Sequence, residues 1–144
     1  MGFAPNHNAM NIAEPIALYA SLWKSLGGSD EIPFPGSAES YINVHSDCGQ
    51  DQVARLHIYA SLNPDKTAGE AFNVADQDVP NSWRDVWPGI VAYFGLKGIG
   101  PSEKLSGEAW VRSQTAKWEE WTKEKGLKPK VLENTCWGFM TIVA

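Results

Sequence analysis

The sequence lacks the features by which several common protein classes are recognised. Its 12 Lys and Arg residues form no cluster and are outnumbered by 17 Asp and Glu residues, which gives a net charge of −5. An acidic chain without a basic face does not attract phosphate backbones, so we expect no nucleic-acid partner. The two cysteines, Cys48 and Cys136, have no metal-ligand spacing and form no disulfide framework. We therefore predict no bound metal.

Targeting segments are also missing from the sequence pattern. The first ten residues, MGFAPNHNAM, contain no basic stretch followed by an apolar one, so they do not resemble a signal peptide. No apolar run approaches the ~18 residues needed to cross a bilayer. We predict a protein without a membrane span, located in the cytoplasm with reduced thiols.

A nucleotide-binding loop is absent as well, because the sequence contains no G-x-G-x-x-G. The glycines of GLKGIG, residues 95–100, follow a predicted helix, whereas a phosphate-binding loop opens a helix after a strand. Tyr93 and Lys97 have the Tyr-x-x-x-Lys spacing of short-chain dehydrogenases, but Gly95 interrupts the helix between them. We interpret them as a packed tyrosine and a solvated lysine.

What the sequence does contain is enough apolar material for one folded domain. Of its 144 residues 43% are apolar, and seven are tryptophan. A chain of this length buries about 68–70% of its surface on folding, so we predict a single domain over residues 1–144. Tryptophan is large and apolar, so the seven indoles indicate either a heavy core or a pocket for a bulky apolar ligand.

Hydrophobic periodicity predicts about four helices and about three strands. Apolar residues at helical spacing favour helices over residues 11–28, 48–62, 82–95 and 108–126. Short apolar runs favour strands at 40–46, 71–76 and 135–144, and the Pro- and Gly-rich run 31–37 is typical of a loop. Alternating strands and helices predict an α/β fold with a small, mostly parallel sheet.

Two histidines are candidate functional residues. His45 lies at the end of a predicted strand beside Ser46 and Asp47, and strand ends face the ligand crevice in α/β folds. His7 lies in the polar loop PNHNAMN, which an apolar helix follows, an arrangement that can form one wall of a pocket. Imidazole and carboxylate groups can transfer protons, so these residues are candidates for general acid–base roles.

Three segments resemble a known family: PNHNAMNIAEPIALYASLWKSLG, SDCGQDQVARLHIYAS and AFNVADQDVPNSWRDVWPGIVAYFGLKG. They look like the C-terminal half of the progesterone 5β-reductase/iridoid synthase-like short-chain dehydrogenases, which reduce enones with NADPH. The match runs from about Gly2 to Ile142, and the third segment is fairly specific to this group. The resemblance implies a truncated Rossmann-like remnant, because the family's Gly-rich loop and catalytic Tyr and Lys belong to the N-terminal half.

The resemblance also assigns a substrate-side wall. It implies that residues 6–11, the start of the following helix and the region around residues 137–140 face the substrate, and that the Ser46–Asp47 turn lies near a cofactor. The predicted catalytic residues are His7, His45 and Asp47. The predicted substrate-binding residues are Phe3, Asn6, Met10, Asn11, Tyr19, Trp23, Trp137 and Met140.

From these features we predict an enzyme that uses no cofactor. It would hold a hydrophobic terpenoid- or polyketide-like molecule and catalyse a cyclisation, isomerisation or pericyclic step in secondary metabolism, because positioning alone can lower a barrier by several kcal/mol (roughly 7–11 in the best cases). An exposed sheet edge would be covered in a homodimer. Two alternatives stay open: a fragment or split half of an NADPH-dependent enone reductase, and a non-catalytic binding or accessory protein.

Overall fold

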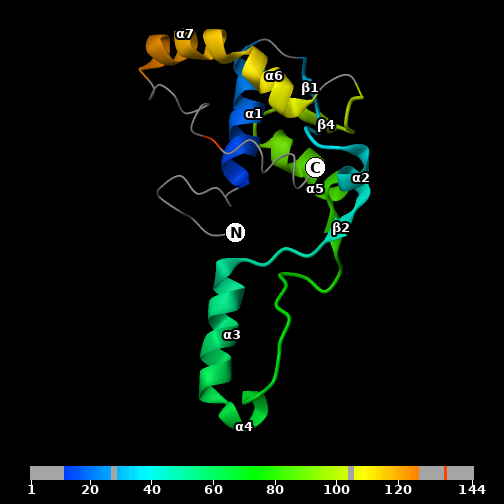
Figure 1. Ribbon diagram of the computed structural model, residues 1–144, viewed down its shortest axis with the longest axis vertical. Coiled ribbons are helices and arrows are strands. Elements are labelled where there is room, and N and C mark those ends of the chain that lie inside the picture. Colours follow the sequence, from blue (N-terminus) through cyan, green and yellow to red (C-terminus); the bar gives the residue numbers. More distant parts are fainter. Residues whose placement is uncertain (1–11, 27–28, 104–105, 127–134, 136–144) are drawn as a thin grey trace. The chain divides into compact units, whose positions relative to one another are not determined.

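A computed structural model describes residues 12–26, 29–103, 106–126 and 135. The chain divides into two compact units (Figure 1). Unit 1 comprises Met1–Phe3 and Val44–Asn81, and unit 2 comprises Ala4–Asn43 and Ser82–Ala144. The described residues form seven helices, more than the four predicted, because several short helices carry no periodic signal of their own.

Unit 2 is built on a small parallel sheet. Strand β1, Glu31–Pro33, pairs in parallel with β4, Lys97–Ile99, and Ile32 lies opposite Gly98. Residues 31–37 were predicted to be a loop, and that prediction was wrong at β1. Proline has no N–H to donate to a strand ladder, which is why Pro33 weakens the sequence signal yet fits a short edge strand.

Helix α5, Trp83–Ala92, packs against β4. It begins where predicted, because the backbone N–H and the hydroxyl of Ser82 both donate to Oδ2 of Asp85, at 3.0 and 2.5 Å. It ends at Ala92, three residues before the predicted end at Gly95. Gly95 closes the turn that follows the helix and has a φ of 70°, which glycine adopts without strain.

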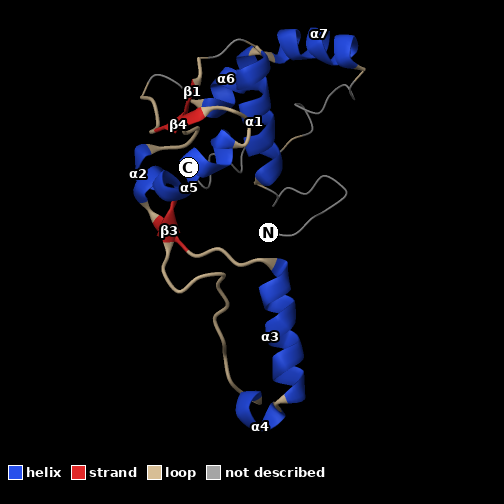
Figure 2. Cartoon of the chain, turned by 180° about the vertical axis from the view of Figure 1, so that it is seen from behind, coloured by secondary structure: helices blue, strands red, loops and turns tan. Residues whose placement is uncertain are grey.

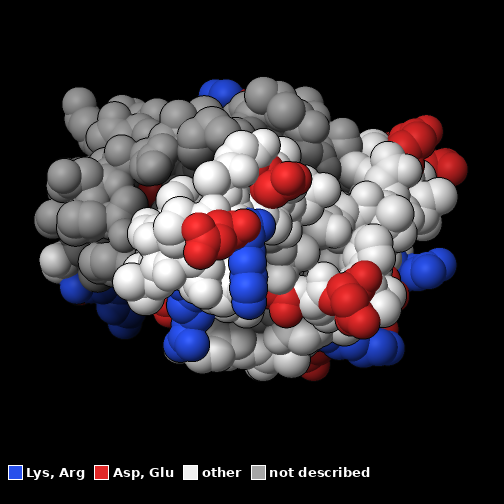
Figure 3. All heavy atoms as spheres, turned by 90° about the horizontal axis from the view of Figure 1, so that it is seen from below, with Lys and Arg blue, Asp and Glu red and all other residues white. Residues whose placement is uncertain are grey.

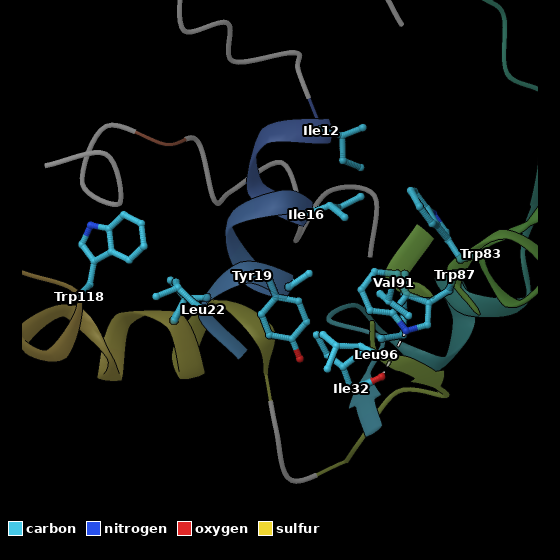
Figure 4. Close-up of a cluster of buried hydrophobic side chains, with 13 residues drawn as sticks. Ile12, Ile16, Tyr19, Leu22, Ile32, Trp83, Trp87, Val91, Leu96 and Trp118 are labelled. Carbon is cyan, nitrogen blue, oxygen red and sulfur yellow. Dashed lines mark hydrogen bonds between the residues drawn. The ribbon is translucent and has the colours of Figure 1, made fainter. Parts of the chain in front are cut away.

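The other helices of unit 2 complete its core. Helix α1, Ala13–Ser25, confirms the first predicted helix and packs against α6, Gly107–Ser113, while α2, Ala38–Ile42, packs against α5. Helix α7, Thr115–Lys125, follows α6, so the single helix predicted over 108–126 is in fact two. The close-up in Figure 4 shows side chains from α1, β1, α5 and α7 in one cluster. Its buried members are Ile12, Ile16, Tyr19, Ala20, Leu22, Ile32, Phe34, Trp83, Trp87, Val91, Leu96, Val111 and Trp118.

Unit 1 contains α3, Gln50–Leu62, and the short α4, Pro64–Thr67 (Figure 2). Strand β2, Val44–His45, pairs with β3, Asn81–Ser82, in a two-stranded sheet. The predicted strand at 40–46 is therefore shorter than expected, because α2 occupies its first residues. Of the strand predicted at 71–76, residues 71–75 form no strand with any described part of the chain, and residue 76 lies in a bend. The strand predicted at 135–144 lies outside the described residues except for Thr135.

Candidate functional site

His45 and Asp47 form the polar centre of unit 1. Strand β2 ends at His45, and Nε2 of its imidazole lies 3.5 Å from Oδ2 of Asp47. Side chains two residues apart in extended chain point to the same side, which explains why these two meet. Both are partly open to solvent. A carboxylate beside an imidazole can orient the ring, and both groups are of the kind that serve in general acid–base chemistry.

The turn that carries Asp47 is held by Asp76. The backbone N–H of Asp76 donates to the carbonyl oxygen of Asp47 at 2.9 Å, and Oδ1 of Asp76 accepts from the N–H of Gly49 at 2.9 Å. Gly49 is the N-cap of α3, so the carboxylate also faces the positive end of the helix dipole. Sequence reasoning missed Asp76, since nothing in its local sequence indicates a contact 27 residues away.

The thiol of Cys48 adjoins this centre and its Sγ lies 3.6 Å from the carbonyl oxygen of Gly49. Within the described part of the chain, no group of three or more His, Cys, Asp and Glu side chains is arranged to hold a metal ion. His57, on α3, faces its own helix, with Nδ1 2.7 Å from the carbonyl oxygen of Val53. His45 is thus the described histidine that is paired with a carboxylate.

Tyr19 and Trp23, both predicted to bind substrate, belong to an aromatic layer of unit 2. Tyr19 is 0% exposed, and its hydroxyl donates to the carbonyl oxygen of Pro33 at 3.1 Å. Burial raises the pKa of this phenol above its ordinary value, so Tyr19 stays neutral and acts as a hydrogen-bond donor. The Trp23 indole donates to the carbonyl of Ser29 at 2.9 Å and packs on Trp110, with ring centroids 4.8 Å apart.

A hydrogen bond at the start of α1 joins two distant parts of unit 2. The hydroxyl of Thr135 donates to Oε1 of Glu14 at 3.3 Å, and Thr135 is buried. Glu14 lies in the first turn of α1, three residues after Asn11, and Thr135 precedes Trp137 by two residues. Residues 6–11 and 137–140 were predicted to form the substrate wall. Glu14 and Thr135, the described residues nearest to them in the sequence, therefore meet at the start of α1. Trp23, by contrast, lies nearer the other end of the helix, roughly 13 Å along its axis.

The other predicted site residues lie outside the described residues. These are the catalytic candidate His7 and the substrate-binding candidates Phe3, Asn6, Met10, Asn11, Trp137 and Met140.

The side chains of Tyr93 and Lys97 are both exposed. Tyr93 is 89% exposed, in contrast to the packed tyrosine expected from the sequence. The Lys97 ammonium contacts Oε1 of Glu31 at 2.6 Å, across the two strands of the sheet. Glu31 raises the pKa of Lys97 by hydrogen bonding and by its charge, so the lysine is held in its charged form.

The surface carries charges of both signs. On the face displayed in Figure 3, Lys and Arg side chains alternate with Asp and Glu, and the described residues there form no large basic patch. Among the described helices, none has the length and apolar character required to cross a membrane.

Comparison with known proteins places the chain in a family. A family model for a PRISE-like Rossmann-fold domain matches residues 1–137. The short chain dehydrogenase ausT of Aspergillus calidoustus is 35% identical, over 97% of this chain and 35% of its own length. The short chain dehydrogenase sirR of Leptosphaeria maculans is 30% identical, over 99% of this chain and 39% of its own length. The chain thus spans little more than a third of the length of these relatives.

The family agrees with the observed fold and with the resemblance read from the sequence. A Rossmann-fold domain is an α/β structure, and unit 2 combines a small parallel sheet with helices. With a family model that covers nearly all of its residues, this chain belongs to the PRISE-like Rossmann-fold family of short-chain dehydrogenase-like proteins.

Proposed function

We propose that the chain supplies the substrate-binding part of a short-chain-dehydrogenase-like enzyme that acts on a hydrophobic small molecule. The observation that carries this proposal is the hydrogen bond between Thr135 and Glu14. It joins the start of α1 to the region before Trp137, and the family resemblance assigns both neighbouring segments to the substrate wall.

In this proposal the residues that contact substrate belong to the chain segments that precede Glu14 and follow Thr135 in the sequence. Polar amides among apolar side chains are typical of small-molecule pockets, where a few polar groups orient an apolar ligand. Tyr19 and Trp23 take a supporting part, since Tyr19 is fully buried and Trp23 packs on Trp110. The contact residues are Phe3, Asn6, Met10, Asn11, Trp137 and Met140.

For the chemical step we propose proton transfer without a cofactor, as in an isomerisation or cyclisation. The supporting observation lies within unit 1 alone: the His45 imidazole approaches the Asp47 carboxylate to 3.5 Å. His7 is a second candidate for moving a proton. The second candidate function is reduction of an enone with NADPH, which the family resemblance implies. The relatives are named short chain dehydrogenases, and that name favours a redox reaction.

Binding is tested with progesterone, an enone of the class that the resemblance implies. Titration of the full chain is followed by tryptophan fluorescence. We expect Asn11→Ala and Trp137→Ala to weaken binding by at least fivefold, and Thr135→Val to weaken it about threefold. Trp121→Ala is the matched control, because Trp121 packs on Trp118 in another part of unit 2. Equal effects of all four substitutions would contradict the proposed wall.

The reaction is tested by mass spectrometry of products formed from a panel of terpenoid and polyketide enones, with and without NADPH. An isomer of unchanged mass supports the cofactor-free step, and we expect His45→Asn to reduce its formation at least tenfold while His57→Asn has no such effect. A product with two additional hydrogens, formed only with NADPH, supports the reductase instead. Binding without any product supports an accessory role. The cytoplasmic location belongs to the same proposal and is tested by imaging a tagged chain.

A further inference from the structure

His45 and Asp47 are held in place by different parts of unit 1. Strand β2 pairs with β3 and ends at His45, whereas Asp47 belongs to the turn that leads into α3. The Asp47 side chain is 52% exposed and that of His45 32%, so packing against other side chains does not by itself fix where they lie. The separation of imidazole and carboxylate therefore depends on how the backbone of the turn is held.

Asp76 holds this turn at two points. Its backbone N–H donates to the carbonyl oxygen of Asp47, and its Oδ1 accepts from the N–H of Gly49, both at 2.9 Å. The carboxylate also lies close to Gly49, because a methyl group on the Cα of that glycine would be 3.4 Å from Oδ1 and from Oδ2. The two hydrogen bonds flank Cys48, so the turn cannot move away from Asp76 without breaking at least one of them.

The contact between His45 and Asp47 is sensitive to such a movement. Its length of 3.5 Å exceeds the range of about 2.7–3.2 Å for an ordinary N–H···O hydrogen bond. A shift of the turn by about 0.5 Å therefore either closes the contact into a hydrogen bond or opens it to the ~4 Å limit of an ion pair. The hydrogen bond made by one ring nitrogen of a histidine determines which nitrogen carries the proton. The place of Asp47 thus decides which nitrogen of His45 can give or accept a proton.

From these contacts we propose that Asp76 is a positioning residue for proton transfer at His45. It acts through the turn: Asp76 fixes Asp47, and Asp47 orients the imidazole. The inference rests on the proposed proton transfer and adds to it a residue outside the reacting pair. The turn needs from Asp76 an oxygen acceptor at the place of Oδ1, so asparagine should replace it and alanine should not. A residue that only capped α3 would stabilise the helix without any effect on the histidine.

The first measurement uses the full chain without substrate. Proton–nitrogen NMR spectra at pH 9, where free imidazole is neutral, show which ring nitrogen of a histidine is protonated. We expect Asp76→Ala to change the ratio of the two His45 tautomers at least ~3-fold, and Asp76→Asn to keep the wild-type ratio. The His57 signals are an internal control, since Nδ1 of His57 faces the carbonyl oxygen of Val53 within α3. Hydrogen exchange along α3 reports that the helix remains formed in each variant.

The second measurement is the rate of isomer formation from the panel of enones. Asp76→Ala should lower kcat at least tenfold and change KM less than twofold, because Asp76 is not among the proposed substrate contacts. Asp76→Asn should keep at least half of the activity. Asp65→Asn, in the first turn of α4, is the matched control and should leave both constants unchanged.

Three results would overturn the inference: a wild-type His45 tautomer ratio in Asp76→Ala, the same altered ratio in Asp76→Asn as in Asp76→Ala, or a full kcat in Asp76→Ala. The NMR readout does not depend on catalysis. If the ratio responds as expected while the wild type forms no isomer, Asp76 still orients His45 and the proposed chemical step fails. If the wild type forms the isomer and Asp76→Ala keeps both its tautomer ratio and its kcat, the proposed function stands and this inference fails.

Discussion

Gly98 of β4 passes so close to Trp87 of α5 that a methyl group on its Cα would lie 2.8 Å from Cδ1 of the indole. The same methyl group would lie 3.0 Å from Cγ2 of Val91 and 3.1 Å from the Cα of Pro88. Two of these neighbours are fully buried, so they have little room to move. The approach of helix to strand in unit 2 therefore depends on a residue without a side chain.

Gly98→Ala should destabilise the protein by about 1–3 kcal/mol, because overpacking forces the helix away from the sheet. Urea denaturation followed by tryptophan fluorescence measures the change. The control is Gly89→Ala within α5, where an added methyl group meets nothing within 4 Å. Alanine there should stabilise the helix by about 0.5–1 kcal/mol. Similar effects at the two glycines would show that the loss of glycine's backbone freedom in the unfolded chain, and not close packing, determines the outcome.

Tyr19 should make the protein sensitive to alkali. Burial raises the pKa of its phenol above the ordinary value of 10.0. At a pH between the ordinary pKa and the raised pKa, the unfolded chain therefore releases a proton that the folded chain keeps. Stability is then fully present below pH 10 and falls above it, by up to about 1.4 kcal/mol per pH unit. Denaturation midpoints at pH 9 and pH 11 should differ more in the wild type than in Tyr19→Phe.

The same substitution removes the hydrogen bond to the carbonyl of Pro33, which should cost about 0.5–1.5 kcal/mol at neutral pH. Tyr93→Phe is the control for both effects, since Tyr93 is almost fully exposed. If Tyr19→Phe retained the full alkaline loss of stability, another group would have to cause it.

Asp85 should contribute to stability in a manner that acid removes. The hydroxyl of Ser82, and then its backbone N–H, hold the pKa of Asp85 below the ordinary value of 3.8. A lowered pKa in the folded state means that the contribution is present at neutral pH and is lost as the pH falls through that lowered value. Asp85→Asn should therefore lower the unfolding temperature at pH 7 and reduce its further decrease between pH 5 and pH 2.

A matched control is Asp51→Asn, because Asp51 also lies in the first turn of a helix, α3. If Asp51→Asn reduced the acid-induced decrease of the unfolding temperature as much as Asp85→Asn does, a general effect of helix dipoles would be the cause.

Asp76 should hold the turn that carries Asp47. In Asp76→Ala the N–H of Gly49 loses its carboxylate acceptor, and a hydrogen bond to a charged group contributes about 1.5–3 kcal/mol before solvent screening reduces it. We expect hydrogen exchange at the Gly49 amide to accelerate at least ~5-fold. Asp78→Asn, two residues along, should leave that rate unchanged. An unchanged rate in Asp76→Ala would mean that other contacts hold the turn.

Local patterns predicted the helices of the core well. Trp83, Trp87 and Val91 recur at helical spacing and are all buried, while Ser82 and Gly95 mark the ends of the segment. Strand β1 could not be predicted in this way, because its stability comes from pairing with β4, and Glu31 and Lys97 are 66 residues apart. Residues 71–76 show the converse case: their alternation favours a strand, but a strand needs a partner to form.

The candidate site was predictable only in part. The closeness of His45 and Asp47 follows from their spacing at the end of a strand, whereas the two contacts of Asp76 depend on how the chain returns. Tyr19 shows another limit, because an aromatic residue on the apolar face of a helix can line a pocket or fill a core, and periodicity does not distinguish the two.

The insertion of residues 44–81 between the two strands of the unit 2 sheet has a kinetic consequence. Glu31 and Lys97 can meet only after the chain between them has closed on itself, and the entropy lost in this closure grows with the logarithm of the loop length. Proteins dominated by such distant contacts fold slowly. Replacing the insertion by a short linker that halves the loop would reduce the closure cost by about 0.6 kcal/mol. The refolding rate of unit 2 therefore depends on the length of residues 44–81, although this segment contributes no residue to the β1–β4 sheet.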